Sequence, residues 1–407
     1  ETAIRISKEL NVPLTVSNDV HHTKQCDWNA KDTLFAVRTI SKKYDPERKL
    51  TTDSDQFYLK SKAEMIGRFR DFPEAINNTV LIAEQCNLDI AVGENHIPVF
   101  DTEGQDVIKY WRNKIREGFE AKYRPGTEYR TEAVQRVKYE IEVIESMGFV
   151  SYFLMVADFI SHARGIDIPV GPGRGSAAGS IVSYCLGITE ICPLEHKLIF
   201  ERFLNSERIS LPDIDIDFCK KRVGEVYGYA QQKYGEKNVA RIATFSSMWA
   251  RSLIRDVGKA YDIPKEEIDS VASSIPEGAG EFRAKIEEQA EDNELIKAYA
   301  SSSEVWKTIL EDAKALEGSK KAVSKHAAGF VIGDDDLTKY IPLMRPVKNK
   351  PGKKKNQVEQ EVSIDTTDTM MFTQYPMDDL EELGLIKMDF LALETLTIIQ
   401  DCIKLIQ

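Results

Sequence analysis

The sequence predicts a mixed α/β (α+β) fold, and three observations support this class. Residues 211–219 alternate aspartate with isoleucine or phenylalanine, which is the period of a strand with one polar and one apolar face. Residues 166–186 give an apolar segment, a glycine-rich run and a helix of small residues, the order found where a strand turns into a helix. Residues 102–164 and 225–318 show helical spacing of apolar residues. We therefore expect a sheet, preceded by helices and interrupted by a mostly helical insert.

Length and composition are those of a globular protein. The 407 residues are enough for two or three domains of about 100–200 residues each. Hydrophobic residues make up 42% of the chain, yet no apolar run approaches the ~18 residues of a membrane helix. The chain begins with Glu, which leads us to expect part of a longer protein. The net charge of −12 argues against a generally basic nucleic-acid coat but is compatible with a local basic groove.

The cysteines and the first residues bear on the cellular compartment. The six cysteines are scattered and form no C-x-x-C pair, which favours reduced thiols over a zinc site or a disulfide framework. The first residues do not read as a signal peptide. These features predict a cytoplasmic protein without a membrane association.

Residues 1 to about 90 are expected to combine a short strand at 12–16 with helices near 30–39, 62–69 and 75–86. The strand leads into a polar segment that contains Asp19, His21 and His22. An aspartate and two histidines at a strand end could bind a metal. A turn with incidental histidines explains the same residues equally well.

The glycine-rich run at 171–180 is the first candidate for ligand binding. It lies between an expected strand at 166–170 and an expected helix at 181–186, so backbone N–H groups could cradle a phosphate there. Arg174 would add a positive charge and Ser176 a hydroxyl. No Gly-Lys-Ser/Thr follows, which excludes a Walker A loop, and the match of residues 173–178 to the dinucleotide pattern is weak. A plain turn is the alternative. The preceding helices, near 134–147 and 152–163, are expected to belong to the core.

The aspartates of residues 211–219 are the second candidate. On a strand, Asp213, Asp215 and Asp217 share a face at about 7 Å spacing, and carboxylates that close repel unless a cation lies between them. Oxygen ligands of this kind suit Mg²⁺ or Mn²⁺. A solvated edge strand is the alternative. A calcium loop is excluded because Phe218 and Gly224 stand where that loop needs Gly and Glu.

Charged residues elsewhere could complete the site. Arg202 and Arg208 precede the aspartate strand and could pair with it or bind a triphosphate. A strand at 385–391 would place Lys387 and Asp389 on one face, so Asp389 could supply the third carboxylate. Residues 241–259 mix basic and aromatic side chains, which suits a nucleic-acid backbone or, more commonly, an amphipathic helix. The lysine-rich run near 345–355 is expected to be a mobile loop, either a solvated insertion or a DNA contact.

Aspartates from separate strands, a glycine/arginine loop and nearby cations suit phosphoryl or nucleotidyl transfer. In a two-metal mechanism, the ions lie about 3.5–4 Å apart; one activates the attacking oxygen and the other stabilises the leaving oxygen. Carboxylates hold such ions, and Arg and Lys neutralise the phosphate charge.

Six motifs, in order along the chain, make a family resemblance specific. They are the glycine run 171–180, Phe-Glu-Arg-Phe-Leu-Asn at 200–205, Pro-Asp-Ile-Asp-Ile-Asp-Phe-Cys at 212–219, Ile-Arg-Asp-Val-Gly at 254–258, Lys-His-Ala at 325–327 and Lys-Met-Asp-Phe-Leu at 387–391. Together they resemble, essentially end to end, the C family of bacterial replicative DNA polymerases, the alpha subunits of DNA polymerase III. The resemblance implies a palm of polymerase-beta-like nucleotidyltransferase fold with a mixed sheet, interrupted by a helical thumb.

The resemblance also implies a domain order and an activity. Residues 1–85 would be the C-terminal part of a polymerase-and-histidinol-phosphatase (PHP) domain, 86–240 the first part of the palm, and 241–322 the thumb. Residues 323–407 would complete the palm and start the connection to the fingers. The implied activity is DNA-directed DNA synthesis, in which a primer 3′-hydroxyl attacks the α-phosphate of a dNTP and releases pyrophosphate.

The resemblance also implies roles for the residues that match the family's motifs. Asp213, Asp215 and Asp389 would be catalytic metal ligands, with Asp217 as an auxiliary acid. The nucleotide phosphates would be bound by Arg174, Gly175, Ser176, Arg202 and Lys387, and a remnant of a PHP metal site would comprise Asp19 and His21. The implied cofactors are two Mg²⁺ ions, replaceable by Mn²⁺, with Zn²⁺ or another metal in a complete PHP domain. The implied partners are primer–template DNA, dNTP, the sliding clamp, the clamp loader and the proofreading exonuclease of a bacterial replisome.

Two rival functions come from other classes. A non-catalytic dinucleotide-binding module needs an acid at a strand end about 20 residues after the glycine loop. Glu190 lies near that distance, but residues 187–193 read as a turn. The other rival is a catalytically silent replisome scaffold, against which the presence of the three aspartates counts. Because the fingers are missing, we expect weak or no polymerase activity from this chain alone.

Overall fold

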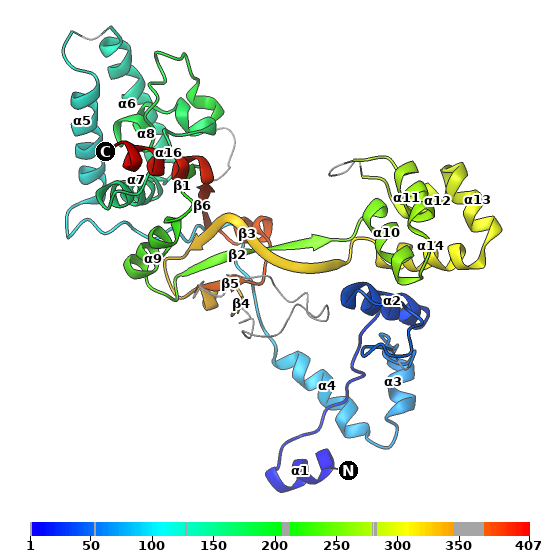
Figure 1. Ribbon diagram of the computed structural model, residues 1–407. Helices are drawn as coiled ribbons and strands as arrows, with labels where there is room; N and C mark the ends of the chain where they lie inside the picture. Colours follow the sequence, from blue (N-terminus) through cyan, green and yellow to red (C-terminus); the bar gives the residue numbers. More distant parts are fainter. Residues whose placement is uncertain are drawn as a thin grey trace. The chain divides into compact units, whose positions relative to one another are not determined.

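The computed structural model describes residues 2–52, 54–126, 128–205, 212–278, 280, 283–345 and 370–407. The described residues form two compact units. Among the described residues, those within 91–244, 324–345 and 370–407 form the sheet unit, and those within 2–90 and 245–323 form the helical unit. Each unit thus joins segments that are far apart in the sequence (Figure 1).

A six-stranded mixed sheet positions the aspartates. Its strands are β1 (Asp215–Cys219), β2 (Val239–Ser247), β3 (Lys320–Ile332), β4 (Leu343–Met344), β5 (Met371–Thr373) and β6 (Ile386–Leu393), in the order β1-β6-β3-β2-β5-β4. β1 runs parallel to β6, whereas β3 runs antiparallel to β6. β5 is parallel to β2 and antiparallel to β4. The mixed sheet and its many helices confirm the predicted fold class.

The helices of the sheet unit are α5 (Val107–Lys122), α6 (Arg130–Ser146), α7 (Val150–Gly165), α8 (Ile181–Cys185), α9 (Val223–Tyr234), α15 (Met377–Glu382) and α16 (Glu394–Ile406), with the short 3-10 helices η2 (Gly175–Gly179), η3 (Phe200–Arg202) and η5 (Leu337–Lys339). Helix α16 lies beside β1 (Figure 1). The central helix α7 is apolar on nearly all sides, which is typical of a helix enclosed by a core.

An aromatic cluster joins α7 to the sheet. The ring of Phe390 on β6 lies 5.2 Å from that of Phe159 on α7, 4.9 Å from that of Phe218 on β1 and 4.6 Å from that of Phe330 on β3. All four side chains are fully buried. Tilted and edge-on rings at these distances add to the stabilisation from buried area, so this face of the sheet is firmly anchored.

The helical unit combines the N-terminal segment with the later helices. It contains α1 (Thr2–Leu10), η1 (Gln25–Asp27), α2 (Trp28–Thr39), α3 (Lys62–Arg68), α4 (Pro73–Gln85), α10 (Ala250–Ala260), α11 (Lys265–Ser274), α12 (Ile286–Asp292), α13 (Glu294–Ser302) and α14 (Glu304–Leu316). Ala30 of α2 shares a hydrophobic core with Ile254 of α10 and Trp306 of α14. Helix α2 therefore packs as a member of this bundle rather than as a separate element.

The predicted helices near 30–39, 62–69, 75–86, 134–147, 152–163 and 181–186 are confirmed, with shifts of a few residues at their ends. The predicted strand at 12–16 is wrong, because that segment is irregular and Val12 is 55% exposed. The predicted strand at 166–170 is also wrong, since only Val170 forms an isolated bridge, to Phe218. The region expected to be helical from 225 contains a strand, β2, whose first five residues are buried.

In the part of the chain that the structure describes, no single helix is both long and apolar enough to cross a membrane. Helices α6 and α7 together have the necessary length and apolar composition, but the pair is bent by 112°.

Candidate metal and nucleotide site

Asp215 and Asp389 lie opposite each other on adjacent strands. β1 and β6 are paired in parallel with Asp215 in register with Asp389. Alternation along each strand sends the intervening residues, Ile216 and Phe218 of β1 and Met388 of β6, to the core face. Both aspartates consequently project from the other face. Their proximity depends on a pairing between segments that are separated by the whole helical insert.

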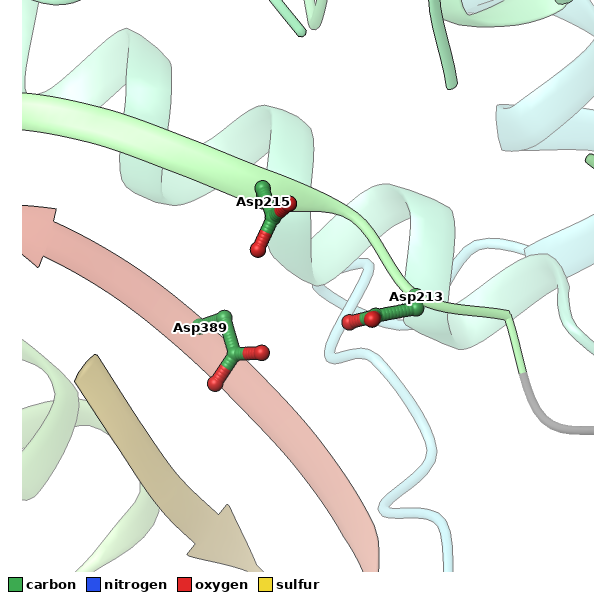
Figure 2. Close-up of side chains that lie close together, drawn as sticks. All are labelled: Asp213, Asp215 and Asp389. Carbon is green, nitrogen blue, oxygen red and sulfur yellow. The ribbon is translucent and has the colours of Figure 1, made fainter. Parts of the chain in front are cut away.

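Asp213 completes a cluster of three carboxylates. It precedes β1, in irregular backbone, and is exposed, whereas Asp215 is partly buried and Asp389 is 6% exposed. One carboxylate oxygen from each aspartate lies within 4.8 Å of those of the other two. Figure 2 shows the three side chains turned toward one another between β1 and β6. Among the described residues, no other group of three His, Cys, Asp or Glu side chains meets the same metal-site criterion.

Lys387 neutralises part of this charge. Its Nζ lies 2.8 Å from Asp389 Oδ2 and 3.5 Å from Asp213 Oδ1, and its side chain is only 13% exposed. Burial by itself would lower the pKa of Lys387, but the hydrogen bonds and ion pairs with Asp389 and Asp213 outweigh burial and raise that pKa above its ordinary value. Lys387 therefore stays positively charged beside the aspartates.

The carboxylates fit a divalent cation. Burial raises the pKa of Asp215, and the neighbouring charge of Asp213 adds to the rise, while Arg174 opposes it. Asp389 Oδ1 is buried and has no hydrogen-bond partner among the residues described. Leaving a buried carboxylate oxygen unpaired is costly, and a hard cation between the three groups would remove that cost. The donor set is all oxygen, which is what Mg²⁺ and Mn²⁺ prefer.

The glycine-rich run lies beside the aspartates. Gly171 approaches Asp217 so closely that a Cβ at position 171 would stand 2.8 Å from the Cβ of Asp217. Gly175 has a φ of +62°, a conformation that favours glycine, and a Cβ there would lie 3.9 Å from Asp215 Oδ2. Gly175 begins η2, and Ser176 is exposed. The glycines thus let the loop backbone pass close to β1.

Arg174 forms ion pairs with both Asp217 and Asp215. Arg174 Nη1 lies 3.5 Å from Asp217 Oδ1, and Arg174 Nε lies 3.5 Å from Asp215 Oδ2. Asp217 is absent from the carboxylate cluster, which includes Asp215 of the same strand and Asp213 just before it. Arg202 ends η3 with an exposed side chain, and within the described residues it forms no ion pair with the cluster.

Asp19 and His21 lie together in the N-terminal segment. His21 Nε2 is 3.2 Å from Asp19 Oδ1, and the His21 ring stacks on Phe57 at 5.3 Å. Both Asp19 and His21 are exposed. His22 turns elsewhere, with its Nδ1 bonded to the carbonyl of Lys24 at 2.7 Å.

Some sequence predictions fall outside the described residues. These are Leu211, Arg208 and the lysine-rich run from 348 to 355, together with the side chain of Lys325.

The sequence did not predict one charged residue that interacts with the site, Glu381. Partial burial raises the pKa of Glu381 on α15, the charges of Asp213 and Asp389 add to the rise, and Lys387 opposes it. Glu381 is one of four acids in residues 378–382, and nothing in that run distinguishes it.

Comparisons with known proteins give the family. Residues 109–392 match the family model described as the bacterial DNA polymerase III alpha NTPase domain. The chain belongs to this family. The matched residues include the glycine-rich run, both aspartate-bearing strands and all three clustered carboxylates, and the predicted resemblance is thereby confirmed.

Curated relatives agree over the whole chain. The chain is 42% identical to the DNA polymerase III subunit alpha of Borreliella burgdorferi over 415 residues, which is 100% of this chain and 33% of the relative. It is 40% identical to that of Treponema pallidum, covering 98% of this chain and 32% of the relative, and 37% identical to that of Bacillus subtilis, covering 100% and 34%. The chain thus spans about a third of the length of the DNA polymerase III alpha subunits that it matches.

Proposed function

We propose that this chain carries the catalytic centre of a bacterial DNA-directed DNA polymerase that transfers dNMP from dNTP to a primer 3′-hydroxyl. The observation that supports this most is the convergence of Asp213, Asp215 and Asp389 within 4.8 Å beside a glycine/arginine loop. Membership in the DNA polymerase III alpha family supports the same activity.

The side chains of the site have distinct proposed roles. Asp213, Asp215 and Asp389 would hold two Mg²⁺ ions, or Mn²⁺ in their place. When bound, such ions lower the barrier by activating the attacking hydroxyl and stabilising charge on the leaving pyrophosphate. Lys387 and Arg174, which are ion-paired to the aspartates, supply positive charge against the triphosphate.

The remaining predicted residues have supporting roles in the proposal. Gly175 and Ser176 offer a backbone N–H and a hydroxyl to the incoming nucleotide, and Asp217 orients Arg174 through their ion pair. Arg202, which is exposed, would reach the nucleotide phosphates only once substrate is bound. Asp19 and His21 would belong to a metal site completed by further residues of a PHP domain, with Zn²⁺ or another metal.

The proposed architecture follows the family. Residues 86–240 and 323–407 would form the palm, 241–322 the thumb and 1–85 the end of a PHP domain. The proposed partners are primer–template DNA, the sliding clamp, the clamp loader and a proofreading exonuclease in the bacterial cytoplasm. The dinucleotide-binding alternative gains no support, because Glu190 lies in an irregular segment and pairs with Arg164 at 2.6 Å.

Primer extension tests the proposed function. The full-length protein that contains this chain should extend a primed template with dNTP and release pyrophosphate in Mg²⁺. Chelation of divalent ions should abolish extension, and added Mn²⁺ should restore it, because the carboxylates cannot act without their cations. Incorporation followed on a denaturing gel measures both. Extension that persists at full rate in excess chelator would contradict the metal-dependent mechanism.

A further inference from the structure

Asp213 is the least firmly held member of the cluster. β1 begins at Asp215, so the strand ladder that fixes Asp215 opposite Asp389 does not extend to position 213. The Asp213 side chain is 58% exposed and meets only one ion-pair partner among the described residues, Lys387 at 3.5 Å. The position of its carboxylate consequently depends on the backbone between Asp213 and Asp215.

A buried tyrosine holds that backbone. The N–H of Ile214 donates a hydrogen bond to the hydroxyl oxygen of Tyr152, with 3.1 Å between the two heavy atoms. This N–H belongs to the peptide that joins Asp213 to Ile214. Tyr152 is 1% exposed and lies on α7, at the centre of the sheet unit's core. A peptide N–H buried before the start of a strand needs a partner, and Tyr152 supplies it.

The electrostatic surroundings of the Tyr152 hydroxyl also link it to the three clustered aspartates. Burial raises the pKa of Tyr152 well above its ordinary value, and the charges of the three clustered aspartates add to the rise. The hydroxyl is therefore neutral, and the negative charges of all three carboxylates disfavour its ionisation. The Ile214 side chain is 2% exposed, so the core fixes this residue through both its side chain and its N–H.

We infer that Tyr152 is a positioning residue that orients the Asp213–Ile214 peptide, so that Asp213 and Asp215 present their carboxylates together to a divalent cation. The inference rests on the proposed function, because it assumes that these carboxylates bind metal. Groups that orient metal ligands without touching the metal typically change metal affinity or activity by about 10–100-fold when removed. Tyr152→Phe deletes only the oxygen that accepts from Ile214 and leaves the ring in place.

The test compares three variants of the full-length protein. Tyr152→Phe should weaken Mn²⁺ binding by about tenfold, measured without nucleotide by the electron paramagnetic resonance signal of free Mn²⁺. The rate constant for primer extension should fall by a similar factor, while the KM for dNTP changes little. Tyr229→Phe is the matched control, since it loses a hydroxyl bonded to Asp158 at 2.9 Å in the same unit, and it should bind Mn²⁺ as the wild type does. Asp389→Asn should lose the Mn²⁺ binding of the carboxylate cluster, while any metal in the PHP domain is retained.

The outcomes separate the inference from the proposed function. Wild-type Mn²⁺ affinity in folded Tyr152→Phe, together with lost binding in Asp389→Asn, would overturn the positioning role and leave the metal site intact. Unchanged binding in Asp389→Asn would overturn both. If Tyr152→Phe fails to fold, hydrogen exchange on the wild-type protein decides: Mg²⁺ should slow exchange of the Ile214 amide, and an exchange rate indifferent to Mg²⁺ would overturn the inference.

Discussion

Asp215→Asn is expected to reduce primer extension by the full-length protein by about a hundred- to a thousandfold, the scale reached when a single preorganised electrostatic contact is lost at a catalytic centre. Asparagine keeps the size of the side chain but removes the negative charge that would hold a cation between β1 and β6. Fold should be retained, because Asp215 projects away from the core and the change relieves repulsion within the carboxylate cluster. Single-turnover incorporation and a thermal melt of the same sample measure the two effects.

Asp401→Asn provides the matched control. Asp401 on α16 is half exposed and pairs with Lys221 at 2.8 Å, outside the carboxylate cluster. Exposed pairs of this kind contribute about 0–1 kcal/mol, so Asp401→Asn should extend primers at the wild-type rate. Equal extension by Asp215→Asn and Asp401→Asn would remove Asp215 from the catalytic machinery.

Lys43→Met is expected to destabilise the helical unit by about 3–5 kcal/mol, the cost of breaking a buried ion pair. Lys43 Nζ lies 3.3 Å from Asp312 Oδ2, and both side chains are 4% exposed. The same ammonium donates to Thr33 at 2.6 Å and to the Tyr261 hydroxyl at 2.9 Å. Removing Lys43 would leave the charge of Asp312 buried without its cation. The free energy of unfolding from urea titration measures the loss.

The neighbouring residue supplies the control for this prediction. Lys42 pairs with Asp262 at 2.8 Å, but both side chains are more than 60% exposed. Lys42→Met should therefore cost less than about 1 kcal/mol. The double variant Lys43→Met/Asp312→Leu should recover part of the stability lost in Lys43→Met, since no charge is then left buried. Equal destabilisation by Lys42→Met and Lys43→Met would contradict this account of the buried pair.

Local patterns predicted much of the sheet unit. The alternation in 211–219 correctly separates Ile214, Ile216 and Phe218, all buried, from the aspartates. It also treats Asp213, Asp215 and Asp217 as equivalent, and the structure shows that they are not. Asp213 precedes the strand, and Asp217 lies outside the carboxylate cluster and pairs with Arg174, which also pairs with Asp215. Periodicity predicts which face of a strand a side chain lies on. The differences among the three aspartates depend instead on where the strand begins and on contacts with the glycine-rich loop, which is distant in sequence.

The secondary-structure predictions failed where tertiary contacts did not agree with the local sequence pattern. Residues 12–16 are apolar enough for a strand, but none of the described strands pairs with them, and the segment is irregular. Conversely, β2 lies within a region of helical character, and its buried pairing with β5 decides its conformation. The partnership of Asp215 with Asp389 likewise required a register between distant strands. The sequence predicted this partnership through the family motifs, because the spacing of the two aspartates along the chain does not indicate it.

We propose that Asp213, Asp215 and Asp389 together hold the catalytic cations, and anomalous diffraction from crystals soaked in Mn²⁺ tests this most directly. At least one anomalous peak is expected about 2.1 Å from oxygens of all three carboxylates, including Asp389 Oδ1, with the Lys387 ammonium displaced from the occupied position. Ordered carboxylates that keep their contacts to Lys387, with no anomalous peak between them at saturating Mn²⁺, would contradict it.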